Sequence, residues 1–153
     1  MLGAVCLSAV TIPLSGYLSD VIGRKKMYII GAVTMGVFGF VYFGLLNTGS
    51  SALIFLAMVL SLIPHDMQYG PQAALIAESF TPRLRYSGAS ISYQLASITA
   101  GGPAPLIATA LYATYKSGTP IAIYILFTAV VSIIATMFLK DYTGQDISGE
   151  YDS

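Results

Sequence analysis

The chain is poor in charge. Charged residues make up 9% of its 153 residues, whereas soluble domains carry about 25%. The seven cations and seven anions cancel, and the only basic block is Arg24-Lys25-Lys26, so the sequence argues against a nucleic-acid partner. Cysteine occurs once, at Cys6, which excludes a disulfide framework within the chain.

Familiar catalytic patterns are also missing. The sequence has no cluster of metal ligands, no paired nucleophile and base, and no glycine-rich phosphate loop, so we expect no enzyme, metal or cofactor. The start lacks the cationic region of a secretory signal peptide, since its apolar stretch runs directly into Pro13 and a charged turn.

Long apolar runs dominate the sequence. Hydrophobic residues make up 56% of it, and the mean hydropathy is +0.75. A run of about 18 or more apolar residues can cross a bilayer as a helix. The runs predict an all-α integral membrane bundle over residues 1–139 and a disordered polar tail over 140–153. The five predicted spans are approximately 1–18, 28–46, 52–77, 88–113 and 120–139.

The cations gather on one side of these spans. That side holds Arg24, Lys25, Lys26, Arg83, Arg85 and Lys140, and the other side holds Lys116. By the positive-inside rule, the first side and the C-terminus are cytoplasmic. Five spans then place Met1 outside. We therefore expect the chain to be the C-terminal fragment of a longer protein.

A charged turn separates the first two spans. It matches every fixed position of the pattern G-x-L-x-D-x-x-G-R-K/R-K/R, at Gly16, Leu18, Asp20, Gly23, Arg24, Lys25 and Lys26. The turn thus resembles the signature of the major facilitator superfamily. Such carriers have twelve spans in two similar halves, with the motif after the second and the eighth. Because five spans, counting the one before the motif, precede the tail, the chain resembles spans 8 to 12. A first-half copy is the alternative.

Further stretches resemble the metabolite:proton symporter family within that superfamily. They are residues 69–74, 78–90, 93–97 and 101–108. The resemblance implies proton-coupled symport of a small organic acid or zwitterion by alternating access in a bacterial inner membrane, with the proton gradient as energy source. The implied partners are the lipid bilayer, the missing N-terminal half of the same carrier and a small-molecule substrate. A non-transporting truncated remnant or a small membrane scaffold is the alternative.

The resemblance also implies a cytoplasmic gate at the motif turn. In the superfamily such a loop latches the two halves in the outward-facing state, and here it would use Gly16, Asp20, Gly23, Arg24 and Lys25. Alternatively, the cations only set the topology. At the next turn we expect either a charge network with Arg24 or a solvated charged loop, formed by Glu78, Arg83 and Arg85.

Asp66 is the only charged residue inside a predicted span, near the middle of residues 52–77. A charge at that depth costs about 2.5–3.5 kcal/mol on insertion scales, so Asp66 must pair, be protonated, or face protein or water. Helical spacing places His65, Gln68, Tyr69 and Gln72 in one stripe with Asp66 at its flank. The stripe predicts proton coupling through Asp66 or His65, a polar lining of the substrate path, or little role. Whether the side chains of the adjacent residues His65 and Asp66 touch each other stays open.

Proline and glycine interrupt two of the spans. Pro71 follows Gly70 beside the polar stripe and removes a backbone donor, which predicts a broken helix that lines a cavity, or a kink for packing. In the fourth span, Pro103 and Pro105 follow two glycines and predict a flexion point.

The fourth span also carries polar residues that could reach a central cavity: Tyr93, Gln94 and Ser97. None of the predicted spans contains arginine or lysine. A carboxylate substrate would therefore find its cation in the missing half of the carrier.

Overall fold

The computed structural model describes residues 2–146, with side chains from Cys6 onward. Within that range the regular structure is helical and there is no strand, which confirms the predicted all-α class. The elements are α1 (Leu2–Ile22), α2 (Arg24–Leu46), α3 (Ser51–Ala77), α4 (Arg85–Ala96), the π-helical turn η1 (Ser97–Gly101), α5 (Pro103–Tyr115) and α6 (Thr119–Phe138).

Four helical stretches are long and apolar enough to cross a membrane. They are α2, α3, the stretch from Arg85 to Tyr115, and α6; α1 carries a shorter apolar stretch, Cys6–Ile22. The helices extend beyond several predicted spans. In particular, a single residue separates α1 from α2, where the sequence predicted a connection over residues 19–27.

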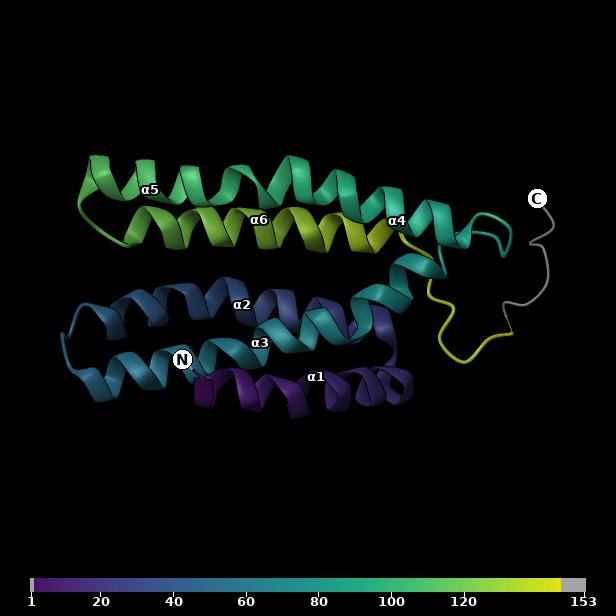
Figure 1. Ribbon diagram of the computed structural model, residues 1–153, viewed down its shortest axis with the longest axis horizontal. Helices are drawn as coiled ribbons and strands as arrows, with labels where there is room; N and C mark the ends of the chain where they lie inside the picture. The colour runs from purple at the N-terminus through teal and green to yellow at the C-terminus, as the bar shows by residue number, and fades with distance from the viewer. Residues whose placement is uncertain (1, 147–153) are drawn as a thin grey trace.

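The helix α2 is central to the bundle. It packs against α3 on one side and α6 on the other, while α1 packs against α3 and α2 (Figure 1). Two glycines permit the close approach. A methyl group at Gly31 would lie 2.8 Å from Cγ of Gln68 on α3, and one at Gly36 would lie 3.1 Å from Cδ1 of Leu126 on α6.

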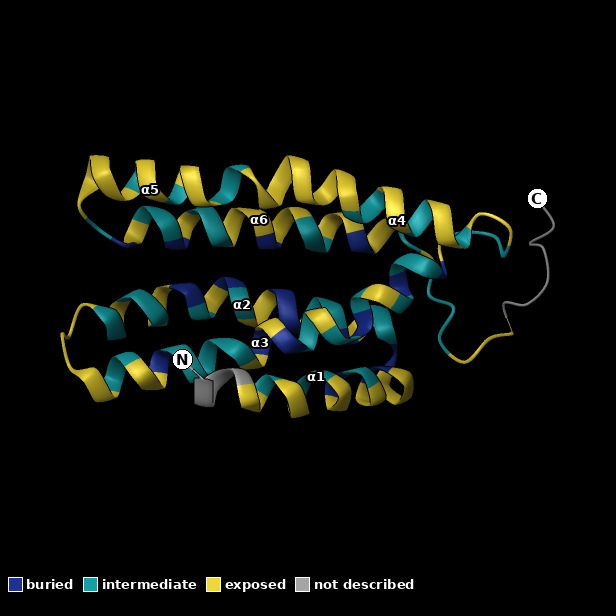
Figure 2. Cartoon of the chain, viewed as in Figure 1, coloured by how far each residue is buried: buried dark blue, intermediate teal, exposed yellow. Residues whose placement is uncertain are grey.

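The stretch from Arg85 to Tyr115 is the least buried of the four membrane-length stretches (Figure 2). None of the residues of α4, η1 or α5 is buried, and the stretch meets the bundle through α4 against α3 and α5 against α6. An apolar helix with so little cover within its own chain presents its surface to lipid or to other helices.

The fourth predicted span contains a local change of helix type. In η1 the amide of Gly102 donates to the carbonyl of Ser97, five residues earlier, at 2.8 Å. Pro103 follows at once and offers no amide for a regular helical hydrogen bond. The structure thus places an irregular turn at the flexion point predicted from Pro103 and Pro105.

The predicted helix break at Gly70-Pro71 is wrong. The helix α3 runs without interruption from Ser51 to Ala77, through both of its prolines. Gly70 serves packing instead, because a methyl group there would lie 2.8 Å from the amide nitrogen of Gly16 and 3.0 Å from the carbonyl oxygen of Ile12. Contacts with α1 and α2 hold α3 helical where Pro71 removes a backbone hydrogen bond.

Candidate functional site

The turn between α1 and α2 depends on Gly23. Its φ of 113° lies in the region that side chains disfavour, and its ψ is 125°. Its amide donates to the carbonyl of Ser19 at 3.0 Å, and its carbonyl accepts from the amide of Met27 at 2.9 Å. Hydrogen bonding therefore continues into both helices, and the chain changes direction at one residue.

The guanidinium of Arg24 contacts two carboxylates. Its Nε and Nη2 donate to Oδ1 of Asp20 at 2.9 and 2.7 Å, and its Nη1 pairs with Oε1 of Glu78. The Asp20 side chain is 54% exposed, whereas that of Glu78, directly after α3, is 7% exposed. A buried carboxylate needs a cation to offset its loss of hydration. Arg24 thus links the motif turn to the end of α3.

The structure brings two members of the predicted charge network, Arg24 and Glu78, into direct contact. Arg83 lies in the loop between α3 and α4, and Arg85 begins α4. Gly16 lies where α1 crosses α3, and a methyl group on it would be 3.8 Å from the carbonyl oxygen of Gly70.

Lys25 caps the end of a distant helix. Its Nζ donates to the carbonyl oxygens of Met137 at 2.8 Å and Leu139 at 2.7 Å, at the C-terminal end of α6. These carbonyls lack helical donors, and a cation there also opposes the negative end of the helix dipole. The motif turn therefore holds α6 as well as α3, a role that the sequence analysis missed.

The start of the tail is packed on the motif turn, which corrects the predicted disorder at this point. The hydroxyl of Thr143 accepts a hydrogen bond from the backbone amide of Arg24 at 3.0 Å. The same hydroxyl and the Thr143 amide donate to Oδ1 of Asp141 at 2.6 and 3.1 Å. Thr143 thereby caps the first amide of α2. Residues 147–153 of the predicted tail lie outside the described residues.

This cap predicts a pH-dependent contact. The side-chain hydrogen bond from Thr143 is the main cause that lowers the pKa of Asp141 below its ordinary value of 3.8, and Lys25 and Lys26 lower it further. Because the folded-state pKa is lowered, the contribution to stability is complete above the ordinary value and is lost as the pH falls through the folded value. We expect the Arg24 amide to exchange with solvent faster, relative to its intrinsic rate, at pH 3 than at pH 5.

Site-resolved hydrogen exchange measures this effect. Asp141→Asn should show the faster exchange already at pH 5, whereas Asp146→Asn should leave it unchanged. Equal protection of the Arg24 amide in the parent and Asp141→Asn proteins would contradict the cap.

Asp66 is completely buried between α3 and α1. One carboxylate oxygen, Oδ2, accepts a hydrogen bond from the hydroxyl of Thr11 on α1, and the other, Oδ1, lies 2.9 Å from Nδ1 of His65. The neighbours His65 and Asp66 therefore touch, although successive side chains on a helix point about 100° apart. Both carboxylate oxygens have a polar partner at membrane depth.

His65 connects this buried carboxylate with a small cavity. The His65 side chain is 53% exposed and its ring stacks on Tyr69, with centroids 5.6 Å apart and planes at 13°. The cavity has a volume of about 210 Å³. It is lined by four predicted residues of the polar stripe and by two residues of α2: His65, Gln68, Tyr69, Gln72, Tyr28 and Met35. Asp66 does not line this cavity itself, but it contacts His65, which does.

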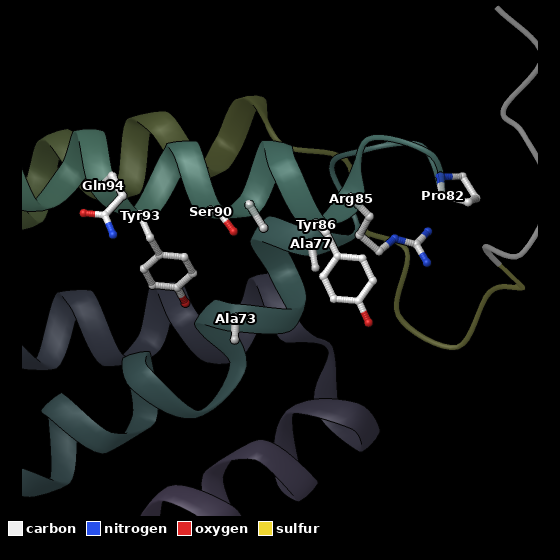
Figure 3. A pocket seen from close by; sticks show the side chains of 9 residues that line it. Ala73, Ala77, Pro82, Arg85, Tyr86, Ser90, Tyr93 and Gln94 are labelled. Atoms are coloured by element: carbon white, nitrogen blue, oxygen red, sulfur yellow. The ribbon is translucent and has the colours of Figure 1, made fainter.

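A larger cavity of about 660 Å³ lies between α3 and α4 (Figure 3). Two predicted residues, Tyr93 and Gln94, line it, while the third, Ser97, lies in η1 and is not among its lining residues. Arg85, which was predicted for the charge network, also lines it. Two further polar lining residues were not predicted from the sequence: Tyr86, which lies outside the predicted span, and Ser90, which lies inside it. The spacing of Tyr86, Ser90 and Tyr93 along one helical face could have revealed them.

Arg85 lies outside the predicted spans and adds a cation to the lining of the larger cavity. It is the first residue of α4, belongs to the apolar stretch that can cross a membrane, and lines the larger cavity. Within residues 2–146, no group of histidine, cysteine or acidic side chains is arranged to hold a metal ion.

Comparisons with known proteins identify relatives of this chain. It is 37% identical over 138 residues to the shikimate transporter of Escherichia coli K12, an alignment that covers 88% of this chain and 31% of the relative. It is 33% identical over 145 residues to the inner membrane metabolite transport protein YhjE of the same organism, covering 94% and 33%. The ectoine/proline transporter ProP of Corynebacterium glutamicum is 28% identical over 142 residues, covering 92% and 28%.

The apolar helices indicate a membrane protein, and these relatives carry the names of transporters rather than of enzymes. The chain belongs to the Major Facilitator Superfamily, whose sequence profile matches residues 1–148. This confirms the resemblance drawn from the motif turn. The chain spans about a third of the length of the curated relatives that it matches, and no solved structure matches it significantly.

Proposed function

We propose that the chain forms spans 8 to 12 of a secondary carrier, which moves a small organic acid or zwitterion together with protons by alternating access. Family membership supports the mechanism, and the names of the relatives, a shikimate and an ectoine/proline transporter, support the substrate class. The missing N-terminal half would supply the other wall of the pathway, since carriers of this kind bind substrate between two repeats.

Asp66 is the observation that carries the proposal of proton coupling. A carboxylate buried at membrane depth is costly when charged, so it is a candidate to gain and lose a proton during a transport cycle. His65 offers a second titratable group between Asp66 and the small cavity. Protons could therefore reach Asp66 without any opening of the contact between α1 and α3.

The larger cavity supports an anionic or zwitterionic substrate. Its volume of about 660 Å³ falls in the range of small-molecule sites. Its polar lining comprises one cation, two tyrosines, a serine and a glutamine, without an acidic residue: Arg85, Tyr86, Tyr93, Ser90 and Gln94. A carboxylate could pair with Arg85 while hydroxyl or amide groups of the solute bond to the remaining side chains.

We place this carrier in a bacterial inner membrane with the motif turn and the C-terminus in the cytoplasm. The inner membrane location follows the printed name of one relative. The orientation follows the six cations that the topology gathers at the motif end, against Lys116 at the other end.

Uptake by cells that express the full-length protein tests the proposal. Labelled shikimate and proline represent the two solute classes, and we expect one of them to accumulate when the outside is more acidic. A protonophore should abolish that accumulation. Accumulation that survives the protonophore but follows a sodium gradient would contradict proton symport.

The alternative is a truncated remnant or a membrane scaffold that does not transport. It is favoured if the coding region has its own start and no upstream segment in frame. An in-frame extension that encodes about seven further spans favours the carrier.

The 153-residue chain by itself should be unable to transport. In proteoliposomes it should give no solute flux above that of empty vesicles, because half of the pathway wall is absent. The full-length protein, reconstituted in the same way, is the positive control. Flux from the isolated chain would contradict the proposal that it is half of a pathway.

A further inference from the structure

Thr11 stands between two hydrogen-bond acceptors. Its Oγ1 lies 3.1 Å from the carbonyl oxygen of Leu7, one turn earlier on α1, and donates a hydrogen bond to Oδ2 of Asp66 on α3. A hydroxyl carries one hydrogen, so Thr11 donates fully to one acceptor at a time. The Thr11 hydroxyl thus has two possible acceptors. One of them belongs to Asp66, the only buried charged residue that lies within a described helix.

We propose that Thr11 is a positioning residue that stabilises the ionised form of Asp66 and releases it on protonation. This inference deepens the proposed function and takes from it only the expectation that Asp66 changes its protonation state. With Asp66 ionised, Thr11 donates to Oδ2, since a charged acceptor binds a donor more strongly than a neutral one. With Asp66 protonated, the Thr11 hydroxyl turns to the carbonyl of Leu7.

The proton balance of the step uses groups in contact. His65, in its Nδ1–H tautomer, gives that proton to Oδ1 of Asp66, which lies 2.9 Å away. Its Nε2 takes a proton from a hydronium ion that enters the small cavity and leaves as water, so the imidazole stays neutral. Oδ2 keeps its orientation toward Thr11 throughout. The hydroxyl hydrogen of Thr11 has an acceptor in both states, so protonation leaves this donor satisfied.

The register of α1 on α3 is fixed next to this hydrogen bond. One turn beyond Asp66, a methyl group at Gly70 would lie 2.8 Å from the amide nitrogen of Gly16 and 3.0 Å from Cβ of Ser15. The two backbones are therefore in direct contact there, which holds Thr11 at bonding distance from Asp66. The hydrogen bond joins α1 to α3 strongly in the ionised state and weakly in the protonated one.

Other titratable groups near Asp66 must be considered in any pH experiment. On α3 these are His65 and Tyr69, and on α2 Tyr28 faces the same small cavity. On α4 Tyr93 is within range of electrostatic interaction with Tyr28 and Tyr69. On α1 the nearest described groups are Cys6 and Tyr17, both exposed, the latter about 9 Å along the helix from Thr11.

Infrared titration of the full-length protein in lipid nanodiscs tests the inference without any solute. The carboxylic C=O band of Asp66, assigned as the band missing from Asp66→Asn, reports the protonated fraction. Thr11→Val keeps the shape and removes the donor. We expect the midpoint of this band to move up by about one pH unit, because the ionised form loses a hydrogen bond to a charged group.

Three further variants make the result specific. Thr11→Ser, which restores the hydroxyl, should return the midpoint to that of the parent. The double variant His65→Gln with Thr11→Val should show the same upward shift of the midpoint relative to His65→Gln alone, since the Thr11 bond to Asp66 is direct. Gly70→Ala, which forces α1 away from α3, should move the midpoint in the same direction.

An unchanged midpoint in Thr11→Val would overturn the inference, and so would a shift that Thr11→Ser fails to reverse. If Thr11→Val does not fold, Thr11→Ala is judged by the same criterion. The outcome is distinct from failure of the proposed function: a carrier that is not proton-coupled can still show the Thr11 shift, and a proton-coupled carrier can lack it.

Discussion

Asp66→Asn should abolish gradient-driven accumulation of the solute while it preserves exchange of internal for external solute. Asparagine keeps the size of the buried side chain but cannot carry the proton. With one proton coupled to each solute, a gradient of one pH unit supplies about 1.4 kcal/mol, enough for a tenfold accumulation ratio. The variant should show a ratio near one.

Vesicles that contain the full-length protein allow this measurement with the membrane potential held at zero. Lys116→Asn serves as the matched control, since it also removes one charge but lies exposed at the far end of the bundle, in a left-handed conformation that asparagine tolerates. The control should accumulate solute as the parent does. Tenfold accumulation by Asp66→Asn would exclude this residue as the coupling group.

Arg24→Gln should lower the stability of the bundle strongly. The change removes a cation that contacts the buried carboxylate of Glu78, and breaking one side of a buried pair costs about 3–5 kcal/mol. At about 2–4 °C per kcal/mol for a chain of this size, the midpoint of thermal unfolding should fall by roughly 6–20 °C. Thermal unfolding in detergent micelles, followed by circular dichroism, measures it.

The adjacent exposed cation provides the control. Lys26→Gln removes the same charge from the motif turn and should change stability by no more than about 0.5 kcal/mol. Glu78→Gln in the Arg24→Gln background should recover part of the loss, because the buried carboxylate is then gone. Equal effects of Arg24→Gln and Lys26→Gln would show that the pair with Glu78 is not what holds the turn to α3.

The sequence was sufficient for the helices and for the position of the motif turn. Apolar runs of membrane length leave few alternatives to helices, because backbone polar groups must be paired within lipid. The polar stripe of α3 was also predictable, since residues at helical spacing share a face, and four of its members line one cavity: His65, Gln68, Tyr69 and Gln72.

Contacts between distant residues could not be read from the sequence. Lys25 donates to the end of α6, more than a hundred residues away in the sequence, and Thr11 donates to Asp66 on another helix. Neither pattern is local, so spacing along the chain gives no signal. The unbroken course of α3 was also not predictable from local sequence. Packing against α1 and α2 keeps the helix continuous, against the local preference of Pro71.

Solute-evoked proton movement is the most direct test of the account, in which the carboxyl of Asp66 carries a proton with each solute. A trapped pH indicator in vesicles of the full-length protein reports it. Addition of solute should acidify the interior of vesicles with the parent protein and leave those with Asp66→Asn unchanged, while both exchange labelled solute. Equal acidification with the two proteins would contradict the account.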